Sequence, residues 1–174
     1  RVQSATKGNV LLRKRQYQLS DDESWSLHVA RLMIGGKIQN YRNILKRYIR
    51  DYGENENINR AVQVLEHAKR EALATQDKTT LIGYEGMASN AYFEVLPVLI
   101  LNQKADFPFH GRNRRPPKDA VNAMLSFAYT LIANDTSAAL ETVGLDPYVG
   151  FLHTLRPGRT SLALDMMEEL RAYL

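Results

Sequence analysis

The sequence of 174 residues is long enough for one well-buried core, and its 44% hydrophobic and 24% charged residues are ordinary for a soluble globular protein. No apolar run approaches the roughly 20 residues that a bilayer-spanning helix needs, and no basic-then-apolar leader is visible, so we expect no membrane association. The absence of cysteine excludes disulfides and thiolate metal sites. Any metal ion would therefore be held by His, Asp or Glu side chains.

The net charge of +4 is unevenly distributed along the chain. Five basic residues precede the first acid, Asp21: Arg1, Lys7, Arg13, Lys14 and Arg15. A second basic cluster contains no acid: Arg112, Arg114, Arg115 and Lys118. Charge alone leaves two interpretations open, a solvated tail and loop or a surface that binds phosphates.

The first 19 residues show no helical period, and residues 10–12 could form a strand or an extended linker. Ser20 followed by Glu23 has the spacing of a capping box. The apolar residues from 25 to 48 then recur at steps of three and four, which predicts an amphipathic helix. Gly35 and Gly36 interrupt this helix, so we expect either a kink or another segment packed close to the bare backbone.

Further helices are predicted over residues 58–72, 78–95 and 118–143, with a loop rich in Pro, Phe and Arg over residues 105–117. Pro97 should end the second of these helices and Gly144 should cap the third. The last helix should begin near residue 159 or 160 and is still running at Leu174, which favours a piece of a longer chain. The fold class is therefore predicted to be all-α, a single domain of about six helices.

Glu85 stands between two glycines of the predicted 78–95 helix, Gly83 and Gly86. Such small residues would let another segment approach the helix backbone, which favours a site residue. The alternative is an ordinary exposed charge, as most glutamates are. In the next helix Asn122, Ser126 and Tyr129 form a polar stripe, for which a structural hydrogen-bond network is the favoured interpretation.

His153 lies in an apolar segment, and a lone histidine there is more often structural than a ligand. In the last helix Asp165 and Glu168 are three residues apart and share a face, with Arg171 one turn further. One histidine and two carboxylates suit Mg²⁺ or Mn²⁺. Their spacing is not a closed local motif, so the pattern by itself is weak.

Four stretches in a fixed order carry a family resemblance that covers nearly the whole chain: residues 83–93, residues 112–129, residues 144–153 and residues 156–168. They resemble the CRISPR-associated integrase that inserts new spacers, the first-numbered Cas protein, and in particular its type I branch. The stretch Lys37-Ile38-Gln39-Asn40 resembles the Lys-Ile-any-Asn-Gln of this family, with Tyr41 in place of the final Gln.

The resemblance implies that Glu85, His153 and Glu168 hold Mg²⁺ or Mn²⁺, with Asp165 as an acidic neighbour in the same catalytic site. Many relatives carry aspartate where Glu168 stands. We predict that Asp165 does not bind the ion directly but holds a metal-bound water or orients the imidazole of His153. The basic residues expected to contact DNA are Arg112, Arg114, Arg115, Lys118 and Arg171.

The implied activity is that of a metal-dependent DNA endonuclease and integrase, in which a 3′-hydroxyl attacks a phosphodiester. The implied partners are pre-spacer DNA, the CRISPR repeat, the second-numbered Cas protein and, in the full-length protein, a second copy of the chain, all in a prokaryotic cytoplasm. The resemblance implies a β-rich N-terminal domain that we do not expect within this sequence, so residues 1–19 are expected to be the linker from that domain and residues 20–174 the helical catalytic domain. The alternatives are a general metal-dependent nuclease on branched DNA or RNA and a non-catalytic helical nucleic-acid-binding module.

Overall fold

The computed structural model describes residues 9–113 and 115–173, and within them it contains six α-helices, a final 3₁₀ helix and no strand. The elements are α1 (Val10–Asp21), α2 (Glu23–Tyr52), α3 (Glu56–Ala74), α4 (Lys78–Leu99), α5 (Ala120–Thr142), α6 (Ser161–Met167) and η1 (Glu168–Tyr173). The predicted all-α fold is confirmed. Among the described residues, no helix is both long and apolar enough to cross a membrane.

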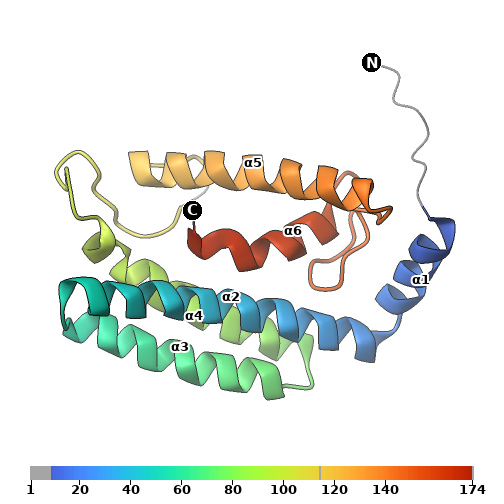
Figure 1. The fold of residues 1–174 in the computed structure, drawn as a ribbon, viewed down its shortest axis with the longest axis horizontal. Coiled ribbons are helices and arrows are strands. Elements are labelled where there is room, and N and C mark those ends of the chain that lie inside the picture. The colour runs from blue at the N-terminus through green and yellow to red at the C-terminus, as the bar shows by residue number, and fades with distance from the viewer. Residues whose placement is uncertain (1–8, 114, 174) are drawn as a thin grey trace.

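The 30-residue helix α2 is the central element of the fold. Helices α3 and α4 pack on one side of it, while α6 and η1 lie on the other side, between α2 and α5 (Figure 1). The main core is built on the apolar face of α2, where Ile34, Ile38, Tyr41 and Leu45 are completely buried. Because α2 contacts both layers, a residue on this helix can reach groups that are distant in sequence.

Side-chain caps explain where most of the helices begin. The carboxylates of Asp77 and Asp119 accept the backbone N–H groups of Thr80 and Asn122, at 2.6 and 2.7 Å, and so start α4 and α5. The cap of α2 is Asp22, which accepts the N–H of Trp25 at 3.0 Å. The predicted start at Ser20 is therefore wrong by two residues, because Asp22 supplies the acceptor.

The prediction that residues 10–12 form a strand or an extended linker is wrong, since Val10 begins α1. The helix lacks a buried apolar stripe, because Gln16 is its only buried side chain and Val10 and Leu11 are exposed. Periodicity could not reveal it for that reason. The Gln16 amide donates to the carbonyls of Asp146 and Val149, both at 2.8 Å, and accepts the N–H of Asp146 at 2.9 Å. Whether residues 1–19 connect to another domain stays a prediction.

The two glycines of α2 do not kink it, because the helix runs unbroken through them. A Cβ atom at Gly35 would lie 2.8 Å from the side chain of Leu73, and one at Gly36 would lie 2.9 Å from that of Glu169. Close packing, the second of the two expectations, is therefore the reason for these glycines. At Gly36 this packing brings η1 against α2.

Three helix ends differ from the sequence prediction. Helix α4 continues past Pro97 to Leu99, because the proline removes only its own backbone N–H from the hydrogen bonds of the helix. Helix α5 begins at Ala120 rather than at residue 118, while Gly144 follows its end with a positive φ of 87°, as expected. The last helix starts at Ser161 and tightens into the 3₁₀ helix η1 at Glu168.

Replacing Gln16 with Ala should loosen α1 from the rest of the molecule. The substitution removes three hydrogen bonds to the segment after α5, at a cost of about 1–3 kcal/mol for the polar groups left unpaired. Hydrogen exchange should become faster in α1, while the amides of α2 to α4 keep their protection. The exposed Gln18, replaced with Ala, is the matched control and should change neither.

Candidate metal centre

A cleft of about 240 Å³ brings together the three residues predicted to hold a metal ion, Glu85, His153 and Glu168. Glu85 comes from α4, His153 from the segment between α5 and α6, and Glu168 from the start of η1. Arg159 and Arg171 also line the cleft. Three regions far apart in sequence therefore meet at one place, although their role as metal ligands stays a prediction.

Lys37 of α2 lies at the base of this arrangement, and its side chain is only 1% exposed. Its ammonium donates to Oε1 of Glu85 and, at 2.8 Å, to Oε2 of Glu168. A buried ammonium is costly unless it is paired, and here two carboxylates pair with it. Lys37 thus links α2 to α4 and to η1 through two ion pairs.

The side chain of Glu85 is 26% exposed at the edge of the cleft, and its Oε1 also accepts the hydroxyl of Ser89 at 2.8 Å. Burial by itself would raise the pKa of this carboxyl, but the charge and hydrogen bond of Lys37, together with Ser89, outweigh it and lower the pKa. The expectation that Gly83 and Gly86 admit another segment is wrong for the part of the chain that the structure describes, because a Cβ atom at either glycine would meet nothing there within 4 Å.

Asp165 is completely buried and acts as a clamp on the segment that carries His153. Its Oδ2 accepts the backbone N–H groups of Phe151 and Leu152, at 2.6 and 2.9 Å. Its Oδ1 accepts the N–H of His153 at 2.9 Å and lies 2.6 Å from the Nδ1 of the same residue. Both oxygens are therefore engaged, and the imidazole is left with Nε2 as its other polar atom, while a role of Asp165 in orienting a metal ligand stays a prediction.

Glu168 is buried, and its second oxygen, Oε1, lies 2.7 Å from the guanidinium of Arg171 and 3.9 Å from Nε2 of His153. The Arg171 guanidinium also lies over the ring of Tyr129, 5.1 Å from its centre. Burial raises the pKa of Tyr129, although Arg171 and Arg112 oppose this shift. Arg171, predicted to contact DNA, is thus paired with a site carboxylate.

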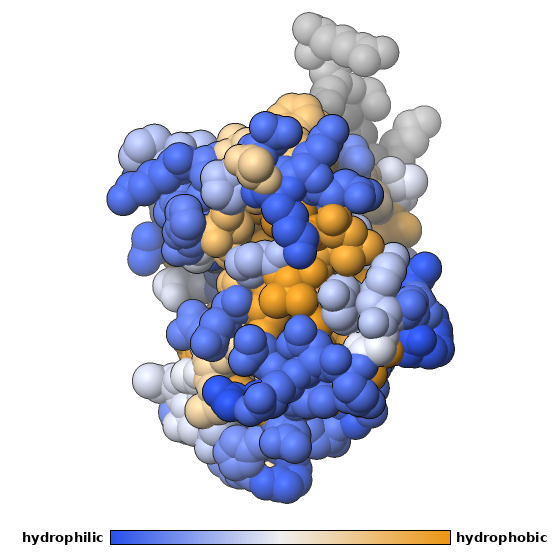
Figure 2. All heavy atoms as spheres, turned by 90° about the vertical axis from the view of Figure 1, so that its left-hand side faces the viewer, coloured by the Kyte–Doolittle hydropathy of each residue, from blue (hydrophilic) through white to orange (hydrophobic). Residues whose placement is uncertain are grey.

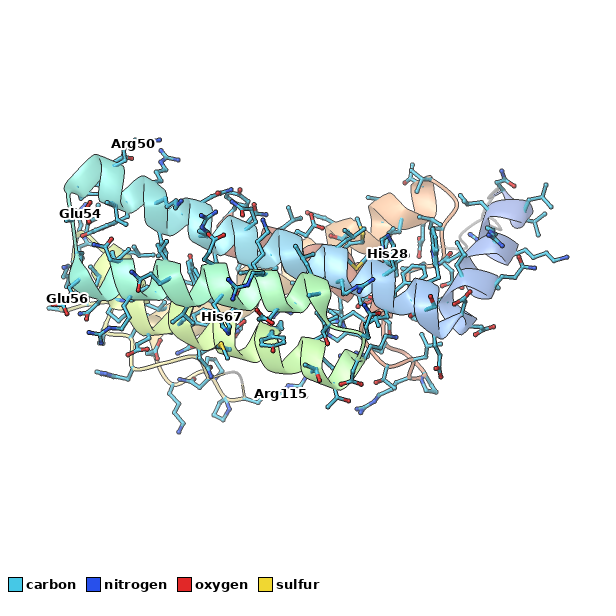
Figure 3. All side chains as sticks on the ribbon, turned by 90° about the horizontal axis from the view of Figure 1, so that it is seen from below. His28, Arg50, Glu54, Glu56, His67 and Arg115 are labelled. Carbon is cyan, nitrogen blue, oxygen red and sulfur yellow. The ribbon has the colours of Figure 1, made fainter. Side chains whose placement is uncertain are left out.

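The basic residues of the loop before α5 lie in two environments, one inside the fold and one on the surface. Arg112 points inward, where its guanidinium donates to Oδ1 of Asn122 at 2.8 Å and to Oγ of Ser126 at 3.2 Å. It also lies over the ring of Tyr129, which confirms that the polar stripe of α5 is a structural network. Arg115 and Lys118 are exposed, and Arg115 lies at the edge of the molecule (Figure 3). Arg114 lies outside the described residues.

The end of the molecule on the left of Figure 1 exposes apolar surface between hydrophilic margins (Figure 2). An apolar cleft of about 360 Å³ opens there between α4 and α5, and Phe107, Tyr129 and Arg171 are among the residues that line it. Arg171 therefore borders both clefts, and its pairing with Glu168 separates the apolar one from the carboxylates.

The donor chemistry fits a small divalent ion, with two carboxylates and one imidazole nitrogen at a cleft. Among the described residues, however, no three His, Asp or Glu side chains form a closed ligand cluster as they stand. The reason is visible in the contacts, because each carboxylate already turns toward a cation, Glu85 toward Lys37 and Glu168 toward both Lys37 and Arg171. Ion binding at Oε1 of Glu168 would require the guanidinium of Arg171 to move.

Sequence reasoning missed Lys37 and Gly150 as parts of the site. Lys37 gave a signal, because it falls on the apolar face of α2, three residues after Ile34 and four before Tyr41, where a charge needs a partner. Gly150 gave none, since the need for it arises from contacts with the distant α6. A Cβ atom there would lie 2.8 Å from the carbonyl carbon of Ser161 and 2.9 Å from the nitrogen of Leu162.

Comparison with known proteins places this helical chain with its carboxylate-and-histidine cleft in one family. The family model described as CRISPR associated protein Cas1 matches residues 1–174. The CRISPR-associated endonuclease Cas1 1 of Chlorobaculum tepidum is 46% identical over 176 residues, which cover 99% of this chain and 51% of that protein. The chain therefore belongs to the Cas1 family, and it spans about half the length of this curated relative.

Solved structures agree with this assignment. A chain of a partial Cas6-RT-Cas1–Cas2 complex superimposes with a TM-score of 0.84 and is 27% identical, covering 98% of this chain and 50% of its own length. A casposase bound to an integration product has a TM-score of 0.74 and is 25% identical, covering 94% of this chain and 47% of its own. The likeness therefore extends over nearly all of the helical fold described above.

Replacing Gly150 with Ala should disturb the His153 segment. The added methyl group meets backbone atoms of α6 that cannot easily move, and such overpacking costs about 1–3 kcal/mol. Thermal unfolding should show a lower melting temperature. Gly83→Ala is the matched control, because the space around Gly83 is open and alanine in a helix is favoured by about 0.5–1 kcal/mol. An unchanged melting temperature for Gly150→Ala would mean that the segment is not held against α6.

Proposed function

We propose that this chain is the catalytic part of a metal-dependent enzyme that cleaves DNA phosphodiesters and joins a DNA 3′-hydroxyl to them, as in the insertion of new spacers into a CRISPR array. The observation that supports this most is the convergence of Glu85, His153 and Glu168 on one cleft. Membership of the Cas1 family and the likeness to a casposase bound to an integration product support it further.

The proposed ion, Mg²⁺ or Mn²⁺, would supply positive charge to an anionic phosphate and activate either water or a 3′-hydroxyl. The residues of the chain prepare the site for it. Asp165 fixes the imidazole of His153 through Nδ1, so Nε2 is the nitrogen available as a ligand. Glu85 and Glu168 provide the oxygen donors, and Arg159 lines the same cleft, where its charge would favour a phosphate.

The proposed partners are pre-spacer DNA and the CRISPR repeat, together with Cas2. The likeness to a chain from a Cas6-RT-Cas1–Cas2 complex supports the Cas2 proposal. The exposed positions of Arg115 and Lys118 suit contacts with DNA phosphates. A homodimer of the full-length protein and a prokaryotic cytoplasmic location stay predictions from the family resemblance.

Titration with Mn²⁺ should stabilise the protein by mass action. At a hundredfold excess over the dissociation constant the gain is about 2.7 kcal/mol, which corresponds to roughly 5–10 °C in melting temperature for a chain of this size. Glu85→Gln, His153→Ala and Glu168→Gln should each remove most of this shift, together with Mn²⁺-dependent cleavage and joining of branched DNA. Glu141→Gln, at an exposed position of α5, is the control and should keep both.

The products distinguish the remaining possibilities. Joining of a 3′-hydroxyl to a branched DNA is expected for an integrase, whereas cleavage without joining would identify a general nuclease. Binding of Mn²⁺ and DNA without either reaction would indicate a non-catalytic module. A wild-type protein whose melting temperature does not respond to Mn²⁺ would refute the metal site itself.

Arg115 and Lys118 should account for part of the salt dependence of DNA binding. Replacing both with Gln should weaken binding to every sequence about equally and reduce the slope of log affinity against log salt by up to about two. Arg112→Gln is the informative contrast, because Arg112 donates to Asn122 and Ser126 and should chiefly affect stability. A loss confined to one DNA sequence would contradict phosphate contacts.

A further inference from the structure

The contacts of Lys37 differ from those of an ordinary buried ion pair, because its ammonium engages one oxygen of each of two carboxylates. It contacts Oε1 of Glu85 and Oε2 of Glu168. Both hydrogen bonds that Glu85 accepts, from Lys37 and Ser89, go to Oε1. Among the described residues this leaves Oε2 of Glu85 open, while Oε1 of Glu168 is the oxygen that lies toward Nε2 of His153.

We propose that Lys37 is a positioning residue that limits Glu85 and Glu168 to one oxygen each as metal ligands and thereby makes the site selective for Mg²⁺ and Mn²⁺ over Ca²⁺. This inference rests on the proposed metal-dependent function. Ca²⁺ takes six to eight oxygen ligands and often binds both oxygens of a carboxylate, whereas Mg²⁺ is octahedral, keeps several waters and uses few carboxylates. An ammonium that holds one oxygen of a carboxylate competes with an ion for that oxygen, so it favours binding of the ion through the other oxygen alone.

Burial makes Lys37 a lasting restraint. With only 1% of its side chain exposed, the ammonium cannot exchange its carboxylate partners for water without opening the core. Arg171 also contacts Glu168 and lines the cleft, so an ion that used Oε1 of Glu168 would have to displace its guanidinium. The two cations therefore have different positions, since Arg171 lines the cleft and Lys37 is buried.

The position of Lys37 in the fold supports the same assignment. It lies on α2, the helix that contacts both α4 and η1, so its two partners arrive from opposite layers of the molecule. The ammonium also lies 5.7 Å from the centre of the ring of Tyr41, which is completely buried. Lys37 thus approaches the carboxylates from the core and leaves to an ion Oε2 of Glu85 and, once Arg171 is displaced, Oε1 of Glu168.

The test compares the affinities of Mn²⁺ and Ca²⁺ by calorimetry on the wild-type protein and on Lys37→Met, which keeps the length and loses the charge. Removing a positive charge strengthens the binding of both divalent ions alike, so the ratio of the two affinities isolates the number of carboxylate oxygens available. Wild type should bind Mn²⁺ at least tenfold more tightly than Ca²⁺, and Lys37→Met should reduce this ratio by roughly tenfold, the size typical of groups next to the ligands.

Two further variants complete the experiment. Lys46→Met, at an exposed position of the same helix, is the matched control and should keep the wild-type ratio. Lys37→Arg retains a cation on the two carboxylates and should restore most of the preference for Mn²⁺. A purely structural ion pair would lower the melting temperature of Lys37→Met without changing the ratio.

Each outcome decides the question. An unchanged ratio in Lys37→Met overturns the role of Lys37, and so does a wild-type protein that binds Ca²⁺ as tightly as Mn²⁺, a result that does not depend on whether the variant folds. Failure of the wild type to bind either ion would instead refute the metal site and this inference together. Binding of both ions with equal strength would leave the metal site standing and refute the inference alone.

Discussion

Charge neutralisation inside a helical core is the constraint on which the rest of this structure depends. Asp165 and Glu168 are buried side by side in the last two helical elements, and a carboxylate removed from water is costly unless its charge is met. Asp165 is neutralised by three backbone N–H groups and an imidazole, whereas Glu168 is met by Lys37 and Arg171. The same contacts hold α2, α4, η1 and the His153 segment together, so the site and the fold cannot be separated.

Small residues make this arrangement sterically possible. Gly36 allows η1 to lie against α2, which brings Glu168 within reach of Lys37. Gly150 allows the segment before His153 to lie against α6, which brings its N–H groups to Asp165. At Gly150 a side chain would meet backbone atoms of α6, whereas at Gly36 it would meet the side chain of Glu169. The steric need for glycine is therefore stricter at Gly150.

The sequence predicted what local periodicity can encode. The apolar faces of α2, α3 and α4 recur at steps of three and four, so these helices and the all-α class were predictable from spacing alone. Helix α1 was not, because Gln16, a polar residue, is its only buried contact. Gly83 and Gly86 were misinterpreted for a related reason, since a glycine in the sequence does not reveal whether space or a neighbour surrounds it. Contacts between distant segments decided both cases.

For the candidate site, the sequence allowed us to predict which residues take part but not which groups they contact. Glu85, His153 and Glu168 were proposed from the resemblance to a family, and the fold does bring them to one cleft. Their hydrogen-bond partners follow from tertiary structure, as Lys37 illustrates. A charge at position 37 on an apolar helix face needs a buried partner. Only the packing of α4 and η1 on α2 shows which carboxylates pair with it.

The contacts of individual atoms determine which polar atoms of the site face the core and which face the cleft. Asp165 takes Nδ1 of His153, and Lys37 takes one oxygen of Glu85 and one of Glu168 from the side of the core. Nε2 of the imidazole and Oε2 of Glu85 remain, whereas the second oxygen of Glu168 is paired with Arg171, and all of these residues line one cleft. Arg159 lines that cleft as well, so an anionic substrate would meet a positive charge on entering it. The buried charges thus serve two purposes, because pairing them stabilises the core and also sets which atoms face the cleft, where Arg171 is the cation that an ion would have to displace from Glu168.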